Sequence, residues 1–240
     1  DYSHDGNARD AFPYEHARSR AYRWSEDGLA GICDREQRLC IALALWNGRD
    51  DHLKERLFGL TRPDGTGVTL PECREHLDAT PTHSYLRTRY RYPQSAFPYE
   101  ALRELAETRE SPETIRLADT GILGGDRAFD VWVEIAKATA EDFLLRITTV
   151  NRGPDAAEIH LLPTIWFRNT WSWGRSRGPK PFLARAAPGR HVIRLEDPRL
   201  GTRWFHAEGE PELLFTENET NRERLFGVPN ETPFAKDGID

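Results

Sequence analysis

The chain has 240 residues, enough to bury a hydrophobic core in one large domain or two small ones. Its 33 Lys and Arg against 39 Asp and Glu give a net charge of −6, which argues against a nucleic-acid partner because such proteins carry a basic stripe. Hydrophobic residues make up 38% of the chain with large aromatic side chains among them, which indicates a globular protein, and no run approaches the ~18 apolar residues of a membrane helix.

Strand signals begin after about residue 26 and dominate the first half of the chain. A short glycine-punctuated segment, 28–33, precedes the apolar run 38–46, which stops at Asn47-Gly48. That run suits a strand buried on both faces, although its period alone also allows a short helix. Another strand is expected over 57–61. Residues 83–92 alternate, so we expect a strand with one aromatic face that includes Tyr90 and Tyr92.

A single segment, 99–109, has the spacing of an amphipathic helix, and strands resume after it. Pro163 predicts an edge position or a bulge for the strand that contains it. Many strands, few helices and frequent turns predict an all-β fold, a large antiparallel β-sandwich with one or two short helices. The strands expected in this half lie at 128–138, 143–150, 157–168, 191–195, 203–206 and 212–216.

Cysteine and histidine spacing gives no support for a metal site. Cys33, Cys40 and Cys73 cannot all pair and match no zinc pattern, so we expect buried or half-buried thiols in a reducing compartment, which favours a cytoplasmic location. His160 lies in an apolar strand and is interpreted as a core histidine, whereas His16 and His83 stay open as ligands. We expect no metal and no cofactor, because phosphate-binding glycine loops and a serine elbow are also absent from the sequence.

Acidic residues are too numerous for their spacing to identify a catalytic pair. Close pairs such as Glu26/Asp27 and Glu217/Glu219 arise by chance among 39 carboxylates. Salt bridging is therefore the default interpretation of each pair.

Clusters of aromatic, arginine and amide residues are more informative. Residues 22–24 place Arg23 and Trp24 just before Asp27, and residues 166–174 hold three Trp together with Arg168 and Asn169. Sugar rings present apolar faces and hydroxyl rims, so aromatic platforms flanked by such polar groups suit carbohydrate. The alternative is that these Trp residues fill the core of the sandwich.

The same clusters carry a resemblance that runs almost from end to end of the chain. The strings SRAYRWSEDGLAGICD, LCIALALWNGRD, DATPTHSYLRTRYRYPQSAFPYEAL, LLPTIWFRNTWSWG and FTENETNRERLFGVPN resemble the N-terminal region of bacterial proteins called glucosidase. Those proteins are similar to glycoside hydrolase family 63, the family of processing α-glucosidase I and the mannosylglycerate hydrolases. Two departures are Ser25, where Gly is expected, and segment 62–72, which differs from the usual Gly-His-rich loop.

This resemblance implies that residues 1–240 form an N-terminal β-sandwich domain, followed beyond residue 240 by an (α/α)6 catalytic barrel. In that family an Asp general acid and a Glu general base act from the barrel with inversion, so no catalytic residue maps onto this chain, and the chain alone is expected to be inactive. The absence of Met agrees with a piece of a longer protein. The expected partners are an oligosaccharide or glycoside substrate and the protein's own barrel.

We therefore expect the aromatic clusters to line the substrate pocket at the edge of the sandwich that faces the barrel. A free-standing carbohydrate-binding module without catalysis is the alternative, and hydrolysis by the sandwich itself is a weaker third hypothesis. The predicted substrate-binding residues are Arg23, Trp24, Asp27, Arg168, Asn169, Trp171 and Trp173.

Overall fold

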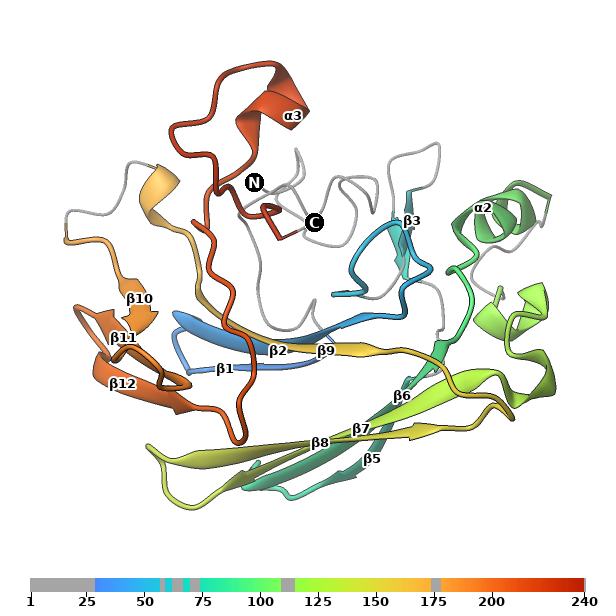
Figure 1. Ribbon diagram of the computed structural model, residues 1–240, viewed down its shortest axis with the longest axis horizontal. Coiled ribbons are helices and arrows are strands. Elements are labelled where there is room, and N and C mark those ends of the chain that lie inside the picture. Colours follow the sequence, from blue (N-terminus) through green and yellow to red (C-terminus); the bar gives the residue numbers. More distant parts are fainter. Residues whose placement is uncertain are drawn as a thin grey trace.

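The computed structural model describes residues 29–56, 59–61, 67–69, 74–108, 115–173 and 178–239. Antiparallel strands dominate these residues, with two short α-helices and three 3-10 turns, so the expected all-β fold is confirmed (Figure 1). The strands are β1 (Leu29–Cys33), β2 (Leu39–Trp46), β3 (Gly59–Thr61), β4 (Gly67–Thr69), β5 (Arg74–Ala79), β6 (Tyr85–Pro93), β7 (Ala128–Lys137), β8 (Phe143–Asn151), β9 (His160–Phe167), β10 (Phe182–Arg185), β11 (Val192–Asp197) and β12 (Gly201–His206). The helical elements are α2 (Tyr99–Thr108), α3 (Arg222–Phe226), η3 (Leu117–Thr120), η4 (Gly124–Asp126) and η5 (Trp171–Trp173).

Two stacked sheets form the sandwich. A four-stranded sheet of order β5-β6-β7-β8 lies against a three-stranded sheet of order β1-β2-β9 (Figure 1). Alternate side chains of each sheet point into the space between them, as expected for half-buried antiparallel strands. The expected aromatic face of β6 is confirmed, because Tyr90 and Tyr92 are buried there. The core residues are Leu29, Leu43, Leu45, Tyr90, Tyr92, Phe129, Val131, Val133 and Ile135.

Strand β2 is the middle strand of its sheet, and its inner six residues are all buried. It pairs with β9 in unbroken register from Leu39 opposite Phe167 to Trp46 opposite His160. Strand β9 lies at the edge of the sheet, which explains why Pro163 is tolerated there without a donor for the ladder. The prediction of a strand buried on both faces is therefore confirmed, and so is the edge position of β9.

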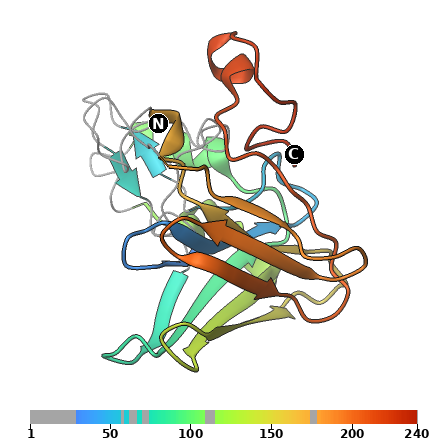
Figure 2. The same cartoon turned by 90° about the vertical axis from the view of Figure 1, so that its left-hand side faces the viewer.

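A second three-stranded sheet, β10-β11-β12, flanks one end of the sandwich (Figure 2). Its inner side packs Ile193 and Leu195 against Phe167, the last residue of β9. A buried carboxylate fastens the same junction, because Asp197 accepts hydrogen bonds from Arg38 Nε at 3.0 Å and Nη2 at 2.7 Å. The small sheet thus fixes the C-terminal end of β9 by packing against Phe167.

The amphipathic helix expected at 99–109 is present as α2. Its Leu102 is fully buried against Phe97, Ile115 and Leu117, so the apolar side of the helix closes a small second core. Among the described residues, no helix is long and apolar enough to cross a membrane.

Three expectations differ from the structure. Segment 212–216 is not a strand, because its main chain lacks a ladder partner among the described strands and Leu214 is 52% exposed. His160 is not a core histidine: it lies at the exposed start of β9, where its ring contacts Glu158 at 3.0 Å and packs against Trp46. No strand was predicted at β4, β5 or β10. In β5 four of the six residues are Arg, Glu, His or Asp, and the strand lies on an exposed edge of its sheet, so it has no apolar pattern to detect.

A buried carboxylate organises the outer face of the four-stranded sheet. The Asp130 side chain is 1% exposed and accepts hydrogen bonds from Arg91 Nε and Arg152 Nε, each at 2.8 Å. Burial opposes its ionisation, but the hydrogen bonds from these two arginines outweigh that effect and hold the pKa of Asp130 below its ordinary value. The carboxylate is therefore ionised in the folded protein and joins β6, β7 and the end of β8.

We predict that Asp130→Asn lowers the free energy of unfolding by about 1–3 kcal/mol, because two partly exposed arginines lose a charged acceptor. The folded pKa is depressed, so this contribution is complete above the ordinary value of 3.8 and is lost as the pH falls below it. Denaturant titration between neutral pH and pH 3 measures both effects. Asp126→Asn is the matched control, because Asp126 is 77% exposed and lies 3.9 Å from the same Arg91. An equal loss in both variants would contradict the assignment.

Candidate functional site

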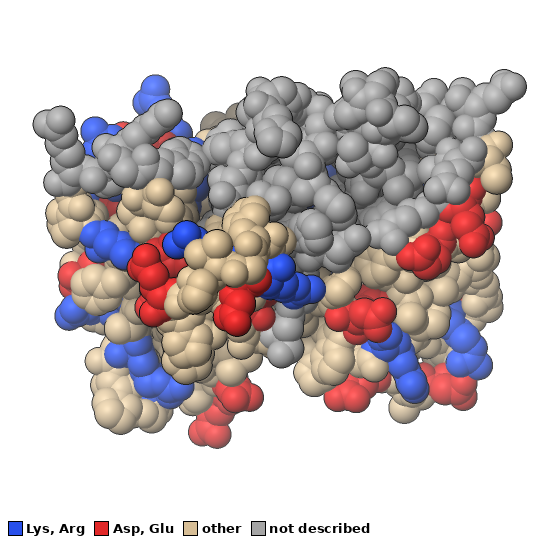
Figure 3. Space-filling model, turned by 90° about the horizontal axis from the view of Figure 1, so that it is seen from above, with Lys and Arg blue, Asp and Glu red and all other residues tan. Residues whose placement is uncertain are grey.

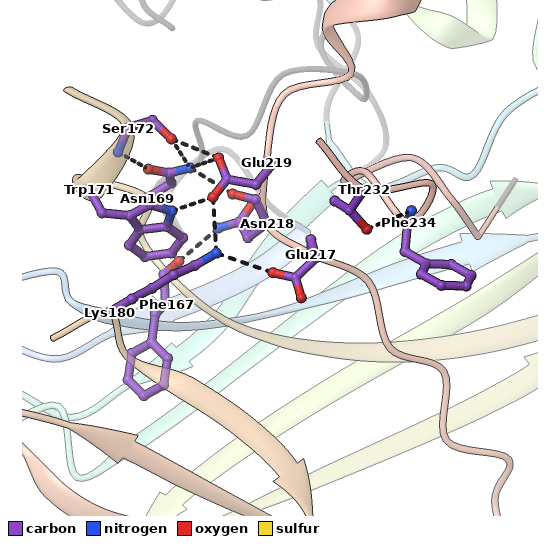
Figure 4. Close-up of polar contacts among 10 residues, drawn as sticks. All are labelled: Phe167, Asn169, Trp171, Ser172, Lys180, Glu217, Asn218, Glu219, Thr232 and Phe234. Carbon is purple, nitrogen blue, oxygen red and sulfur yellow. Dashed lines mark hydrogen bonds and ion pairs between the residues drawn. The ribbon is translucent and has the colours of Figure 1, made fainter. Parts of the chain in front are cut away.

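The described part of the Trp-rich segment lies beside a segment that is distant in the sequence. After β9 ends, Phe167 accepts a hydrogen bond at its carbonyl from Asn218 Nδ2 at 2.8 Å, and Asn169 Nδ2 donates to the Asn218 carbonyl at 2.7 Å. These two amide side chains join the two segments by hydrogen bonds to main-chain carbonyls (Figure 4). As a result, η5 and residues 217–219 form one surface.

The carboxylate of Glu219 lies at the centre of this surface. Its Oε1 accepts from the indole Nε1 of Trp171 at 2.6 Å and from Lys180 Nζ at 3.0 Å. Its Oε2 accepts from Ser172 Oγ at 2.8 Å and from Asn169 Nδ2 at 3.3 Å. Four donors from two parts of the chain, residues 169–172 and Lys180, therefore converge on one carboxylate (Figure 4).

These contacts fix the ionisation of the cluster. Burial opposes the charge on Glu219, but hydrogen bonds from Trp171, Ser172 and Lys180 outweigh it and lower the pKa of Glu219. Burial likewise opposes the charge on Lys180, while Glu219 and Glu217 raise its pKa overall. At neutral pH the surface therefore carries an ammonium between two carboxylates.

Lys180 links the charged groups to the aromatic ring. Its ammonium lies 3.2 Å from Glu217 Oε2 and 5.1 Å from the ring centroid of Trp171, within cation–π distance. Both carboxylates of the 217/219 pair thus bind the same lysine, as the salt-bridge interpretation predicts. The lysine side chain is 45% exposed, so its remaining donor capacity faces solvent.

Trp171 is half-buried and packs against the core cluster of Phe167, Ile193 and Leu195. The indole therefore has a fixed orientation, with the Lys180 ammonium near its face, the Glu219 carboxylate on its N–H, and the neighbouring Ser172 hydroxyl on the same carboxylate. A rigid ring with such a rim presents an apolar surface together with hydrogen-bonding groups. It is the combination that a sugar ring requires.

The structure brings some of the predicted substrate-binding residues together and separates others. Asn169 and Trp171 share the Glu219 cluster, although Asn169 is 2% exposed and so acts by holding Ser172 and Glu219 in place. Arg168 faces the 34–39 turn instead, donating from Nη1 to Gln37 Oε1 at 3.1 Å. Trp173 ends η5. The predicted residues Arg23, Trp24 and Asp27 lie outside the described residues.

Glu219 and Lys180 were not identified as site residues from the sequence. Each lies in a segment without apolar periodicity, and their separation of 39 positions carries no local signal. The only sequence indication was the 217/219 pair, whose spacing places both side chains on the same side of an extended segment.

The chain after Glu219 folds back on the cluster. The Lys236 N–H donates to the Glu219 carbonyl at 2.9 Å, and the Glu217 N–H donates to the Phe234 carbonyl at 2.7 Å. Between these anchors α3 stands out from the sandwich, capped by the Asn221 side chain (Figure 1). This segment, residues 220–235, is called the α3 excursion. It carries an open cavity of about 660 Å³, lined by Asn221, Glu223, Arg224, Asn230, Glu231, Thr232 and Pro233.

Charged residues of both signs are interspersed over the described part of the face seen from above (Figure 3). Within the described ranges, no three His, Cys, Asp or Glu side chains gather in a group that could hold a metal ion. The Glu219 cluster presents hydrogen-bonding groups, charges and an aromatic surface to a ligand.

Comparison with known proteins gives one relative without a known role. No family model matches the chain, and no solved structure matches it. The chain is 37% identical, over 275 aligned residues, to the uncharacterized protein YMR196W of Saccharomyces cerevisiae. The alignment covers 100% of this chain and 25% of the yeast protein, so the chain spans about a quarter of the length of the curated relative it matches.

We predict that Glu219→Gln lowers the free energy of unfolding by about 1–3 kcal/mol, because the amide removes the negative charge that faces Lys180 and replaces one of the two carboxylate acceptors with an NH2 donor. The pKa of Glu219 is lowered from 4.5, so the difference from wild type is full above that pH and shrinks as the pH falls below it. Urea titrations at a series of pH values measure it.

The matched control is Glu217→Gln, whose carboxylate is 51% exposed and contacts the same Lys180. It should change the free energy of unfolding by no more than about 0.5 kcal/mol. A Glu219→Gln variant as stable as this control would show that the cluster does not hold the two segments together.

Proposed function

We propose that this chain is the N-terminal, substrate-framing β-sandwich domain of an inverting α-glycosidase similar to glycoside hydrolase family 63. The observation that carries the proposal is the half-buried Trp171 ring, fixed by Glu219 and bordered by Lys180 and Ser172. The substrate class is an oligosaccharide or glycoside with an α-glucosidic or related α-linkage. We also propose a cytoplasmic location, which suits the thiols of Cys33 and Cys40.

The geometry favours contact with a sugar over a purely structural role. A ring used only as core would be surrounded by apolar atoms, whereas one border of Trp171 meets two charged side chains and a hydroxyl. Lys180 and Ser172 are partly or fully exposed, so their remaining hydrogen-bonding capacity is open to a hydroxyl-rich ligand. Asn169 holds this arrangement in place, because its side chain donates to the Asn218 carbonyl and accepts from the Ser172 N–H.

The ionisation of the cluster argues against Glu219 as the general acid. A glycosidase general acid must hold a proton near neutral pH, and this requires a raised pKa. The pKa of Glu219 is lowered instead. Burial does raise the pKa of Asp50, but that residue is 5% exposed and accepts hydrogen bonds from Tyr92 and the Phe97 N–H inside the fold. The Asp acid and Glu base of the family are therefore proposed to act from an (α/α)6 barrel of the parent protein.

Two further observations support a domain that works with a partner in the same protein. The matched yeast protein is about four times as long as the region it shares with this chain, which leaves room for a barrel. On the excursion that carries α3, Phe226 and Phe234 are 55% and 60% exposed. Apolar side chains of this size on one protruding segment are typical of a surface that packs against a second domain.

The test is steady-state kinetics of the full-length protein on aryl α-glucosides and α-glucosyl disaccharides. Trp171→Ala should lower kcat/KM by about 1–3 kcal/mol of transition-state binding, roughly fivefold to 150-fold, in the protein that remains folded. Trp171→Phe keeps most of the packing and should be less affected. Trp204→Ala is the matched control, because Trp204 is 54% exposed on β12 and lies outside the cluster. Its kinetics should be unchanged.

Three results would contradict the proposal. A stability loss of about 3–5 kcal/mol with normal kinetics would make Trp171 a core residue. Turnover by residues 1–240 alone, abolished by one carboxylate substitution, would place catalysis in the sandwich. Saccharide binding by residues 1–240 with no turnover in the full-length protein would favour a carbohydrate-binding module.

A further inference from the structure

Two of the three cysteines face each other across neighbouring strands. In the β1–β2 hairpin, Cys33 lies opposite Cys40 in the register of the ladder. Both are thiols in the structure, Cys33 exposed and Cys40 buried. The sequence predicted buried or half-buried thiols in preference to a disulfide. This is correct for Cys40 and wrong for Cys33, which lies at the exposed end of β1.

The hydrogen bonds of the hairpin define which kind of pair this is. The Asp34 N–H donates to the Leu39 carbonyl at 3.3 Å, which makes Asp34 and Leu39 a hydrogen-bonded pair. Because the two kinds of pair alternate along an antiparallel ladder, the next pair away from the turn, Cys33 and Cys40, occupies a non-hydrogen-bonded position. At such positions opposite Cα atoms are about 4.5 Å apart and the side chains approach most closely. A disulfide requires Cα atoms about 4.4–6.8 Å apart, so the backbone can accept one without rearrangement.

The turn that joins the two strands is held by side-chain contacts of its own. Asp34 Oδ1 accepts from the N–H groups of Arg38 and Leu39 at 2.6 and 2.7 Å, and the Cys40 thiol lies 4.0 Å from the Gln37 carbonyl. The loop is therefore closed whether or not the cysteines are joined. Formation of the bond then needs only side-chain rotation, with no search through open conformations.

We propose that Cys33 and Cys40 form a reversible cross-strand disulfide by exchange with a low-molecular-weight disulfide of the glutathione type. The exposed Cys33 thiolate attacks one sulfur of the oxidant, whose S–S bond breaks and releases the first thiol. The Cys40 thiolate then attacks the Cys33 sulfur of the mixed disulfide and releases the second thiol. Two protein thiols are oxidised to one disulfide, and one small disulfide is reduced to two thiols.

The difference in exposure gives the two cysteines different roles. Cys33 is the one that a soluble oxidant can reach, and Cys40 resolves the mixed disulfide from inside. The oxidised hairpin would hold the 34–39 turn fixed. That turn contacts Arg168 twice: the Arg168 N–H donates to the Arg38 carbonyl, and the Arg168 side chain donates to Gln37. This site is independent of the proposed glycosidase function.

The test uses the full-length protein, incubated with oxidised glutathione under native conditions, quenched by alkylation and digested with trypsin without reduction. Trypsin cleaves after Arg35 and Arg38, so a Cys33–Cys40 bond joins peptide 24–35 to peptide 39–49. We expect mass spectrometry to find this linked pair, to lose it after dithiothreitol, and to find both cysteines alkylated in the sample without oxidant.

Variants separate the steps. Cys40→Ser should trap a glutathione adduct on Cys33, because the resolving thiol is gone, whereas Cys73→Ser should leave the linked pair unchanged. Wild-type protein that retains glutathione on Cys33 with Cys40 still a thiol would overturn the proposal. Linkage of either residue to Cys73 instead would also overturn it. All of these readouts are independent of glycosidase activity.

Discussion

Burial of β2 is the constraint that fixes its neighbours β1 and β9 and anchors their sheet against the four-stranded sheet. The strand is hydrogen-bonded along both edges, to β1 and to β9, and its inner six residues are withdrawn from water. Each buried large aliphatic side chain contributes about 1.5–3 kcal/mol, so a shift of register is costly. A slip of one residue would also exchange the two faces of the strand. The end of β9 is thereby fixed at Phe167, and the Trp-rich segment begins from a defined point.

Beyond Phe167, hydrogen bonds between polar groups hold the chain in place. Asn169 is buried and satisfied by main-chain and side-chain partners, so it behaves as a fixed connector between η5 and residues 218–219. Glu219 then collects donors from Trp171, Ser172 and Lys180, and its lowered pKa keeps it charged. Since each group already has a defined partner, a ligand that binds here meets a preorganised surface and loses little free energy to its ordering. The same contacts hold the base of the α3 excursion through the Glu219 carbonyl.

The sequence predicted what depends on local patterns. Alternation located β6 and its buried tyrosines, the apolar run located β2, and Pro163 placed β9 at an edge. It failed where tertiary context decides. Segment 212–216 has the composition of a strand but pairs with none of the described strands, and His160 lies in an apolar stretch at an exposed strand end.

The candidate site was predicted only in part for the same reason. Trp171 and Asn169 could be identified because aromatic and amide residues cluster in the sequence. Glu219 and Lys180 could not, because their contact joins segments 39 positions apart. The Cys33–Cys40 pair became visible only when the ladder register was known. Long-range pairing of this kind has no counterpart in composition or periodicity.

The most direct measurement is a crystal structure of the full-length protein with a non-hydrolysable α-glucosyl disaccharide bound. We predict a sugar ring within about 4 Å of the Trp171 indole, with hydroxyls hydrogen-bonded to Lys180 or Ser172 and the catalytic carboxylates supplied by another domain. A disaccharide bound far from Trp171, with the indole covered by apolar side chains of a neighbouring domain, would contradict it.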